Sequence, residues 1–427
     1  MTTTRTSATR AERAAATTAI ARQTLDLADI VEVRDLLPWK VSDLSIRPYP
    51  DMWSMNPSIH FDGETWRCVL RCTDYAMPGG VSIRGAKANK NYVQSNNALV
   101  ILDPASWKPA KVHLMKELDE EARVVACASI GFEDMRLFQT ERGGLQGIAA
   151  SLHLDRQLER SALTFAADPR RPRAPGGRNR VIHQAQPAPA RSTRPPRPGS
   201  GGSRGSHPPE QVLLSFDESY NIVDAKPLRG PWNGAPQKNW VPFDGCTEAR
   251  FLYSIDGEVV FDIEGPIDRA SPKEPSSSSP AGRTTAGVQG GTEIRLLRRP
   301  VAVTAGRASR LHYSGIRGGT QLVHVGDAFG SDSAWLGLGH EMRFLRGRKF
   351  YWHSIYLVDS TGRMLAKSPP IKLSPKHGIE FAAGLAVDSD GDRAVISFGL
   401  DDMHCKLAET RLSALLETLE PVQPKPA

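Results

Sequence analysis

The chain has 427 residues, of which 40% are hydrophobic and 24% charged, so it holds enough apolar side chains for a sizeable core. Its net charge of +7 arises in residues 167–210, where nine Arg stand against Asp168 and Glu210. Outside that segment 45 Lys and Arg balance 45 Asp and Glu, which excludes a basic nucleic-acid-binding face on the folded part.

The five cysteines have no spacing typical of a disulfide framework or a zinc knuckle, and most lie in apolar runs. This pattern indicates a reducing compartment, so we expect a cytoplasmic protein. The first residues contain no apolar signal-peptide core, and no stretch approaches 18 uncharged apolar residues. We therefore expect no membrane span.

The N-terminal region, residues 1–49, is predicted to be a tail followed by a helix. Residues 9–30 are rich in Ala and end with Leu25, Leu27 and Ile30, which predicts one helix on the surface of the following domain.

From about residue 56, short β-branched and aromatic runs alternate with turn residues. Hairpins with Asp256-Gly257 and Thr361-Gly362 at their tips are predicted, and a short helix is expected at 406–419. The hairpins recur every 40–60 residues without a crossover helix between them, which favours an all-β propeller over a parallel α/β sheet. The runs that predict strands are 66–75, 97–103, 124–134, 250–263, 350–368 and 393–402.

Two low-complexity segments interrupt this pattern. Residues 167–210 are rich in Pro and Arg, and residues 269–291 are rich in Ser, Pro, Gly and Thr. Neither segment holds enough apolar residues to offset the entropy of the chain, so both are predicted to be disordered loop insertions. The first is interpreted as a solvated loop, with a tether for an acidic partner or RNA as the alternative. We expect one propeller domain over 50–415 and a tail over 416–427.

The first motif with possible chemistry is GFEDMRLF (131–138), which places Glu133, Asp134 and Arg136 at the end of a strand. Alternation along an extended strand predicts that Asp134 and Arg136 point to the same side. The Arg then holds either the neighbouring acid or a substrate anion. The structural alternative is an Asp–Arg pair at the turn of a blade.

The second motif is KNWVPF (238–243), with Lys238 and Asn239 before Trp240. An aromatic ring provides a platform for a sugar, and Lys provides a point charge for a phosphate. The alternative is a Trp in the core beside a solvated Lys.

The third group runs from IRGGTQLV (316–323) to FYWHSIYLVD (350–359) and lacks the spacing of a phosphate-binding P-loop. Arg317 lies beside two Gly that allow a close backbone approach, and His340 with Glu341 ends an apolar run. Tyr351 and His353 follow. One of these His residues alone would read as a core residue, but two with Arg317 upstream indicate a site.

The fourth group holds Asp388, Asp390 and Asp392, which resemble a calcium loop. Gly399 stands where that loop needs Glu, so we interpret the segment as a charged hairpin turn and expect no metal. Glu380 and Asp402 flank this hairpin as acids at the ends of buried strands.

In their order, the motifs resemble the glycoside hydrolase family 130 superfamily, and most closely bacterial relatives associated with glycosyltransferases. The resemblance covers residues 50–155 and 211–410 and skips both low-complexity segments. It implies a five-bladed β-propeller with a central pocket. It also implies inverting phosphorolysis of β-mannosides, hydrolysis in some members, and mannosyl transfer from nucleotide sugars in related propellers.

The resemblance assigns the role of acid to Asp134, whereas Arg136, Lys238 and His340 match positions that line the phosphate and sugar pocket. Two departures stand out, because Met135 replaces the usual Pro and Glu341 stands where Gly is common. The second places a carboxylate near the anion site, which leaves phosphorolysis, hydrolysis and transfer open.

We therefore expect a carbohydrate-active enzyme acting on an oligosaccharide or glycoside, without a cofactor, with inorganic phosphate or a nucleotide sugar as co-substrate. The alternatives are a glycosyltransferase with a nucleotide-sugar donor and a non-catalytic propeller that binds glycans or a protein. The expected catalytic residues are Asp134 and Glu133, with Trp240 as sugar platform. The expected substrate-binding residues are Arg71, Arg136, Lys238, Asn239, Arg317, His340, Glu341, Tyr351 and His353.

Overall fold

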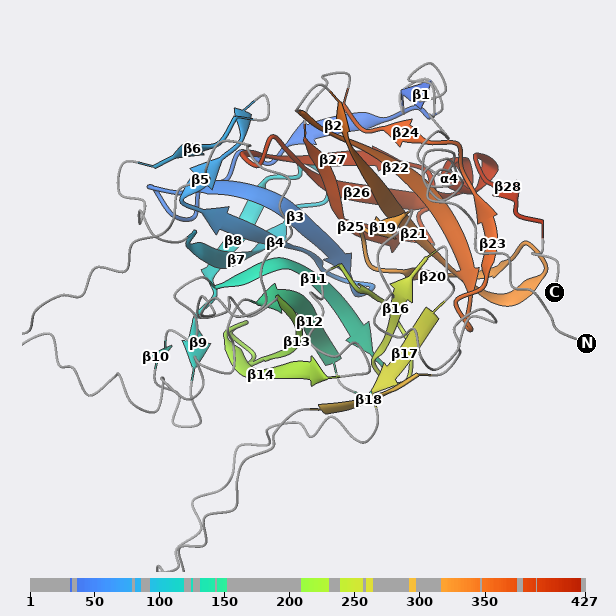
Figure 1. The fold of residues 1–427 in the computed structure, drawn as a ribbon, viewed down its shortest axis with the longest axis horizontal. Coiled ribbons are helices and arrows are strands. Elements are labelled where there is room, and N and C mark those ends of the chain that lie inside the picture. The colour runs from blue at the N-terminus through green and yellow to red at the C-terminus, as the bar shows by residue number, and fades with distance from the viewer. Residues whose placement is uncertain are drawn as a thin grey trace, which may run out of the picture.

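The structure is a computed structural model (Figure 1). In the part of the chain that the structure describes, no helix is long and apolar enough to span a lipid bilayer. The predicted helix over 9–30, the insert 269–291, Lys238 and the Asp256-Gly257 tip lie outside the described residues, as does 167–208 of the first insert. The described residues are 31–32, 37–78, 81–85, 93–118, 124–125, 131–142, 144–151, 209–229, 239–255, 259–263, 292–296, 316–345, 348–374, 379–388 and 390–423.

The first two four-stranded units are antiparallel and follow chain order. The first consists of β3 (Trp53–Phe61), β4 (Trp66–Thr73), β7 (Ser95–Leu102) and β8 (Pro109–Leu114). The second consists of β11 (Phe132–Thr140), β12 (Gly144–Ser151), β13 (Glu210–Phe216) and β14 (Ile222–Arg229). The short strands β9 (Glu117–Leu118) and β10 (Val124–Val125) extend the second unit through β14, whereas β5 (Tyr75–Ala76) and β6 (Ile83–Arg84) form a separate two-stranded sheet.

The third and fourth units continue the series. The third consists of β15 (Val241–Pro242), β16 (Arg250–Ser254), β17 (Val259–Ile263) and β18 (Thr292–Leu296), and β18 pairs in parallel with β14. The fourth consists of β20 (Val323–Ala328), β21 (Ser331–Leu345), β22 (Arg348–Asp359) and β23 (Met364–Lys367). Four short strands border it, namely β1 (Val31–Glu32), β19 (Arg317–Gly318), β24 (Ile371–Lys372) and β28 (Glu420–Pro421).

The fifth unit joins the two ends of the domain. It consists of β25 (Glu380–Asp388), β26 (Arg393–Leu400), β27 (His404–Thr410) and β2 (Lys40–Asp43). Strand β2 pairs antiparallel with β27, from Lys40 opposite Glu409 to Asp43 opposite Lys406. The outermost strand of the last unit therefore comes from the beginning of the chain, ahead of the boundary expected at residue 50.

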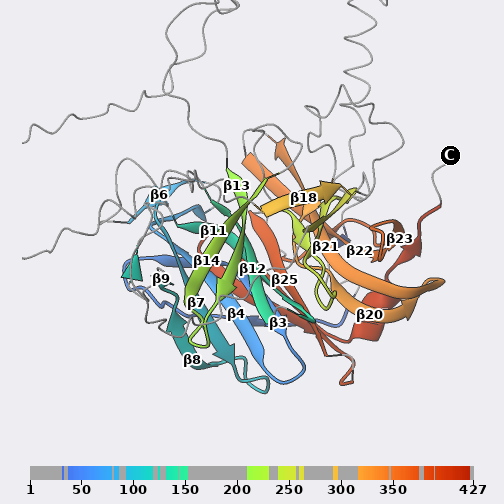
Figure 2. The ribbon, with the colours of Figure 1, turned by 90° about the horizontal axis from the view of Figure 1, so that it is seen from below.

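Burial shows which strand of a unit lies innermost. Strand β3 is buried along almost its whole length, whereas β8 in the same sheet is almost wholly exposed. A strand that is buried on both faces must be covered by neighbouring sheets. The innermost strands β3, β11 and β25 lie side by side at the centre of the molecule (Figures 1 and 2).

Apolar side chains fill the space between consecutive units, and also between the fifth and the first. These contacts arrange the five units in cyclic order, so the fold is all-β with five propeller blades, as predicted. One pair of side chains that share an apolar cluster or a ring contact illustrates each of these junctions. The pairs are Val69 and Leu137 for units one and two, Phe138 and Phe251 for two and three, Leu252 and Leu322 for three and four, Leu338 and Leu385 for four and five, and Ile59 and Val395 for five and one.

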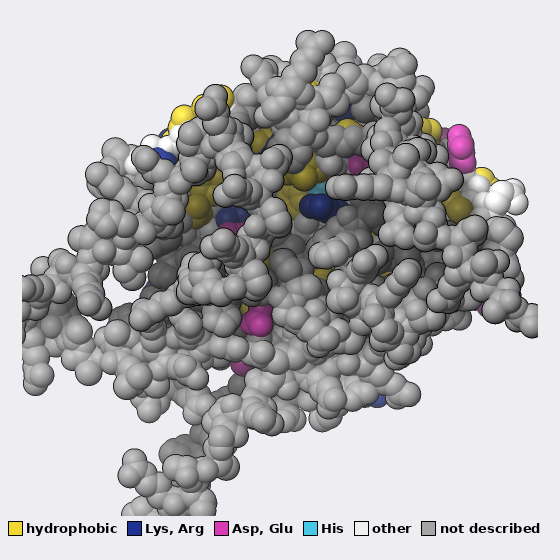
Figure 3. Space-filling model, viewed as in Figure 1, with side chains coloured by type: hydrophobic (Ala, Val, Ile, Leu, Met, Phe, Trp, Pro, Cys, Tyr) yellow, Lys and Arg dark blue, Asp and Glu magenta, His cyan; other side chains and the backbone are white. Residues whose placement is uncertain are grey.

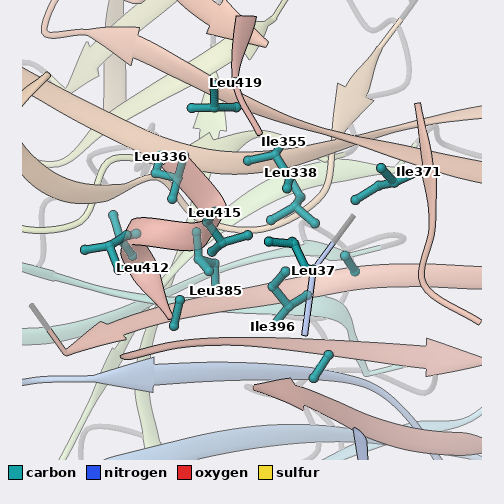
Figure 4. Close-up of a cluster of buried hydrophobic side chains, with 14 of the residues drawn as sticks. Leu37, Leu336, Leu338, Ile355, Ile371, Leu385, Ile396, Leu412, Leu415 and Leu419 are labelled. Carbon is teal, nitrogen blue, oxygen red and sulfur yellow. The ribbon is translucent and has the colours of Figure 1, made fainter. Parts of the chain in front are cut away.

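The C-terminal helix is shorter than expected. The structure has strand β27 up to Thr410 and only then α4 (Leu412–Glu417), so the prediction of a helix from residue 406 is wrong. Alternating burial along β27 explains the difference, because its buried face packs with the fifth unit. Leu412 and Leu415 of α4 pack with strand residues such as Leu336 in one apolar cluster (Figure 4).

Two predicted turns are present. Gly362 has φ +78° in the turn between β22 and β23, where the Asp359 carboxylate accepts the backbone N–H groups of Thr361 and Arg363. Between β25 and β26, the Asp388 carboxylate accepts the Gly391 N–H, and Asp392 binds Ser413 of α4. The charged segment at 388–392 therefore forms a hairpin turn.

Candidate active site

The carboxylate of Asp134 is buried near the start of β11. Asp134 is only 7% exposed and has φ +51°, a left-handed conformation that is uncommon for a residue other than Gly. The pairing of β11 with β12 shifts register between Glu133 and Arg136. This bulge redirects the Asp134 side chain, so the regular alternation assumed from the sequence does not hold here.

Two neighbours on the first blade hold the Asp134 carboxylate. Arg71 Nη1 donates to Oδ1 at 2.9 Å, and Asn56 Nδ2 donates to the same oxygen at 2.8 Å. Arg71 also contacts Glu133 through Nη2 at 3.1 Å and donates from Nε to Ser95 Oγ. One guanidinium is thus shared by two carboxylates, which leaves this trio with one net negative charge.

Burial of the Arg71 guanidinium would by itself lower its pKa. The carboxylates of Glu133 and Asp134 act in the opposite direction, and the resulting pKa lies above the usual range of Arg. Arg71 therefore stays charged and helps to neutralise the two acids.

The Arg136 guanidinium donates hydrogen bonds to oxygens of several segments. Nε donates to the Gly319 carbonyl, Nη1 to the Asp134 carbonyl at 3.1 Å, and Nη2 to Asn239 Oδ1 and the Gly318 carbonyl. Its ring neighbour is Phe381, with the guanidinium carbon 5.6 Å from the ring centroid. Arg136 is only 1% exposed, and its guanidinium is bound by oxygens of the protein. The prediction that this guanidinium binds a substrate anion therefore does not fit its surroundings.

His340 and Arg317 face each other as paired residues of β21 and β19. The His340 ring centroid lies 5.0 Å from that of Phe381 and 5.7 Å from that of Tyr351. Burial lowers the pKa of His340 well below its usual value, and the charges of Arg136 and Arg317 add to this effect. The imidazole is therefore neutral at physiological pH and can donate or accept one hydrogen bond at each nitrogen.

Two tyrosines and Asp402 complete the group. Burial, together with the charges of Asp402 and Asp134, raises the pKa of Tyr351 to about 12, although Arg317 acts to lower it. Burial also raises the pKa of Tyr75, on which Arg71, Asp402 and Asp134 act as well. Electrostatic influence of Asp134 and Asp402 on both tyrosines places the two acids around one site.

Asp402 lies in the tight turn between β26 and β27. Asp401 and Asp402 have φ +54° and +48°, and the Met403 N–H donates to the Leu400 carbonyl. Such a turn requires a positive φ at both central residues, a conformation that Asp tolerates better than most residues other than Gly and Asn. Asp401 binds the Ile379 N–H with its carboxylate, whereas Asp402 is half-buried near the tyrosines.

Two residues predicted for the site belong to the core instead. Trp240 is fully buried, and its ring packs at 6.0 Å from Phe251 and 5.7 Å from Tyr253, so the prediction of a sugar platform is wrong. His353 is also fully buried, and its Nε2 accepts the Ala382 N–H at 3.1 Å. Neither side chain presents a surface to a substrate.

Glu341 and Glu380 have other surroundings. Glu341 follows His340 in regular pairing with β22, so their side chains point to opposite faces of the sheet. Glu380 accepts the N–H groups of Leu373 and Ser374, and Lys372 lies 3.8 Å away. Glu380 therefore stabilises a turn of the fourth blade.

The residues that do converge come from all five blades. Figure 3 shows Lys or Arg side chains together with a His side chain near the centre of the face seen in Figure 1. Asn239 belongs to this group of residues because its Oδ1 accepts a hydrogen bond from Arg136. Asn56, Tyr75, Phe381 and Asp402 were not predicted as site residues. The converging residues are Asn56, Arg71, Tyr75, Glu133, Asp134, Arg136, Asn239, Arg317, His340, Tyr351, Phe381 and Asp402.

Comparisons with known proteins give similarity in structure only. No family model matches the sequence, and no curated protein matches it. A β-1,2-mannobiose phosphorylase from Listeria innocua has 12% identity and a TM-score of 0.43, over 88% of this chain and 96% of its own. A mannose phosphorylase from Leishmania mexicana, solved with a phosphate ion, has 10% identity and a TM-score of 0.42, over 90% and 91%. A GDP-Man-dependent mannosyltransferase from Leishmania mexicana has 8% identity and a TM-score of 0.42, over 93% and 94%.

Proposed function

We propose that this protein is a carbohydrate-active enzyme that cleaves or transfers a glycosyl unit of a β-mannoside, with inorganic phosphate as the preferred acceptor. The observation that carries the proposal is the juxtaposition of a buried carboxylate pair with a separate cationic group. Asp134 and Glu133 share Arg71, and Arg317 is paired with the neutral His340, on which Asp134 also acts electrostatically.

Glycosidic bond cleavage needs a proton at the leaving oxygen and a nucleophile on the opposite face of the sugar. The trio of Glu133, Asp134 and Arg71 can bind one proton while Arg71 keeps an ion pair with the second carboxylate. Asp134 thereby serves as the group that donates the proton to the glycosidic oxygen and takes it back in the reverse reaction.

The nucleophile is proposed to lie near Arg317 and His340. Arg317 is paired with His340 across β19 and β21, and we assign it the cationic contribution to anion binding. A neutral His340 supplies an N–H donor without adding a second charge. This arrangement suits a single phosphate better than a diphosphate, which favours phosphorolysis over transfer from a nucleotide sugar.

Hydrolysis is the second candidate, because a specific residue supports it. Asp402 is a half-buried carboxylate on the fifth blade, apart from the Asp134 group, and it can activate water in place of phosphate. The two reactions differ in their products, since phosphorolysis yields a sugar 1-phosphate and hydrolysis yields the free sugar.

The test incubates the purified full chain with β-linked mannobioses, with and without inorganic phosphate, and separately with GDP-mannose. Formation of mannose 1-phosphate that requires phosphate supports the proposal. Free mannose at a rate independent of phosphate supports the hydrolase. Consumption of GDP-mannose alone, or no turnover of any of these substrates, contradicts the proposal.

A further inference from the structure

The hydrogen bonds of Arg136 connect three blades. Its guanidinium donates to the Asp134 carbonyl of the second blade, to Asn239 beside the third, and to the carbonyls of Gly318 and Gly319 at β19 beside the fourth. All of these acceptors are carbonyl or amide oxygens, which offset the buried charge through their dipoles. Burial nevertheless lowers the pKa of Arg136 to about 10, so the group remains charged at neutral pH.

The segment around Gly318 and Gly319 is shaped for this contact. A Cβ on Gly318 would lie 2.1 Å from the Asn239 carbonyl oxygen, and one on Gly319 would lie 2.5 Å from the Leu338 carbonyl oxygen. No side chain fits at such distances, so only Gly lets this backbone come close to its neighbours. Arg317, immediately before them, therefore lies on a segment that is packed tightly against Asn239 and Leu338.

Two of the acceptor residues have left-handed backbones. Asp134 has φ +51° and Asn239 has φ +63°. Such conformations cost free energy and persist only where the surroundings enforce them. Arg136 binds the main-chain carbonyl of the first and the side chain of the second, so it supports both conformations directly.

We propose that Arg136 is a positioning residue that fixes Asp134 relative to the Arg317 segment, and that it does not bind the substrate anion. This inference rests on the proposed function, in which Asp134 transfers the proton and Arg317 binds phosphate. Its specific consequence is a separation of effects, because loss of Arg136 should impair turnover while phosphate binding persists.

The kinetic test compares Arg136→Lys with Arg317→Met in the full chain. Lys keeps the charge but cannot reach three blades with one planar group. We expect Arg136→Lys to lower kcat about 100-fold, as misplacement of a catalytic group by about 1 Å does. The Kd for inorganic phosphate, measured by calorimetry, should change less than about 3-fold, whereas Arg317→Met should raise it at least about 10-fold. An equal loss of phosphate affinity in both variants would overturn the proposal.

Asn239→Gly provides a milder variant if Arg136→Lys does not fold. Gly accepts φ +63° and removes a single acceptor of the Arg136 group. We expect a reduction of kcat by about 10-fold with unchanged phosphate affinity, in line with the loss of one hydrogen bond to a charged group. Unchanged kcat in this variant would also count against the proposal.

A structural readout separates this inference from the proposed function. If the wild-type chain neither binds phosphate nor turns over mannosides, the proposed function fails, and crystal structures of the wild type and Arg136→Met still test the positioning role. We expect Asp134 to leave the left-handed region and to lose its contact with Arg71 in the variant. An Asp134 that keeps its backbone conformation and the Arg71 contact without Arg136 would refute the inference.

Discussion

Arg71 and Asp134 form an ion pair at 2.9 Å across two blades, with the guanidinium on β4 and the carboxylate on β11. Both side chains are buried, and Glu133 binds the same guanidinium. The pair therefore connects the packing of the first two blades with the chemistry proposed for the site.

Replacement of Arg71 by Met should destabilise the fold strongly. It leaves two acids without their counter-charge, and breaking a buried pair in this way costs about 3–5 kcal/mol. Chemical denaturation measures the free energy of unfolding. Arg142→Met is the matched control, because Arg142 pairs with Glu248 at an exposed position and should cost at most about 1 kcal/mol. Equal effects of the two substitutions would contradict the role given to Arg71.

Asp402 and Asp401 offer a matched pair in one turn. Asn is tolerated at positive φ, so Asp402→Asn and Asp401→Asn both retain the turn. We expect Asp402→Asn to lower kcat/KM about 10- to 100-fold, as loss of a charged hydrogen bond to substrate does, with little change in stability. Asp401→Asn should lower the melting temperature slightly and retain activity, since a neutral amide oxygen accepts the Ile379 N–H less strongly than the Asp401 carboxylate does. The reverse outcome would show that Asp402 is a structural residue.

His353 should make the fold sensitive to acid. Burial lowers the pKa of His353 to about 3 from 6.5, so between these values the unfolded chain binds a proton that the folded chain does not. The stability that neutral His353 provides is therefore present above pH 6.5 and is lost as the pH falls, by roughly 1.4 kcal/mol per pH unit.

His353→Gln tests this dependence, because the Gln oxygen can accept the Ala382 N–H without titrating. Denaturation between pH 7 and about pH 4 should show a smaller loss of stability in the variant than in the wild type. Parallel pH profiles for the two proteins would contradict this assignment.

Trp240 should matter for stability rather than for sugar binding. Its ring is fully buried against Phe251 and Tyr253, so Trp240→Ala should cost about 3–5 kcal/mol of unfolding free energy. Trp240→Phe should cost less and leave KM unchanged. A raised KM with unchanged stability would restore the sugar platform that the sequence predicted.

Most of the fold could be predicted from the sequence. The β-branched and aromatic residues of β22 and β26 predict strands directly from the sequence. The sequence also has no helical pattern between the hairpins that could serve as a crossover, which excludes a parallel sheet. Strand β2 was missed because KVSD is short and mostly exposed, and only its pairing with β27 makes it a strand. Local sequence carries no information on such a distant partner.

The site was predicted less completely, for two physical reasons. Regular alternation assigned Arg136 to the same side as Asp134, but the bulge at that point turns the guanidinium to protein carbonyls. Asn56 was missed because it lies 78 residues from Asp134, a contact that only the blade packing creates. Trp240 was misassigned because an aromatic residue beside a Lys looks the same in a core and in a sugar site.

The most direct test of the central claim is the turnover of β-linked mannobiose by Asp134→Asn in the presence of inorganic phosphate. Asn retains the size of the side chain and tolerates φ +51°, but it cannot transfer the proton. We predict a loss of kcat of at least about 100-fold with a retained cooperative unfolding transition. Wild-type turnover in the folded variant would contradict the role of Asp134 and with it the proposed mechanism.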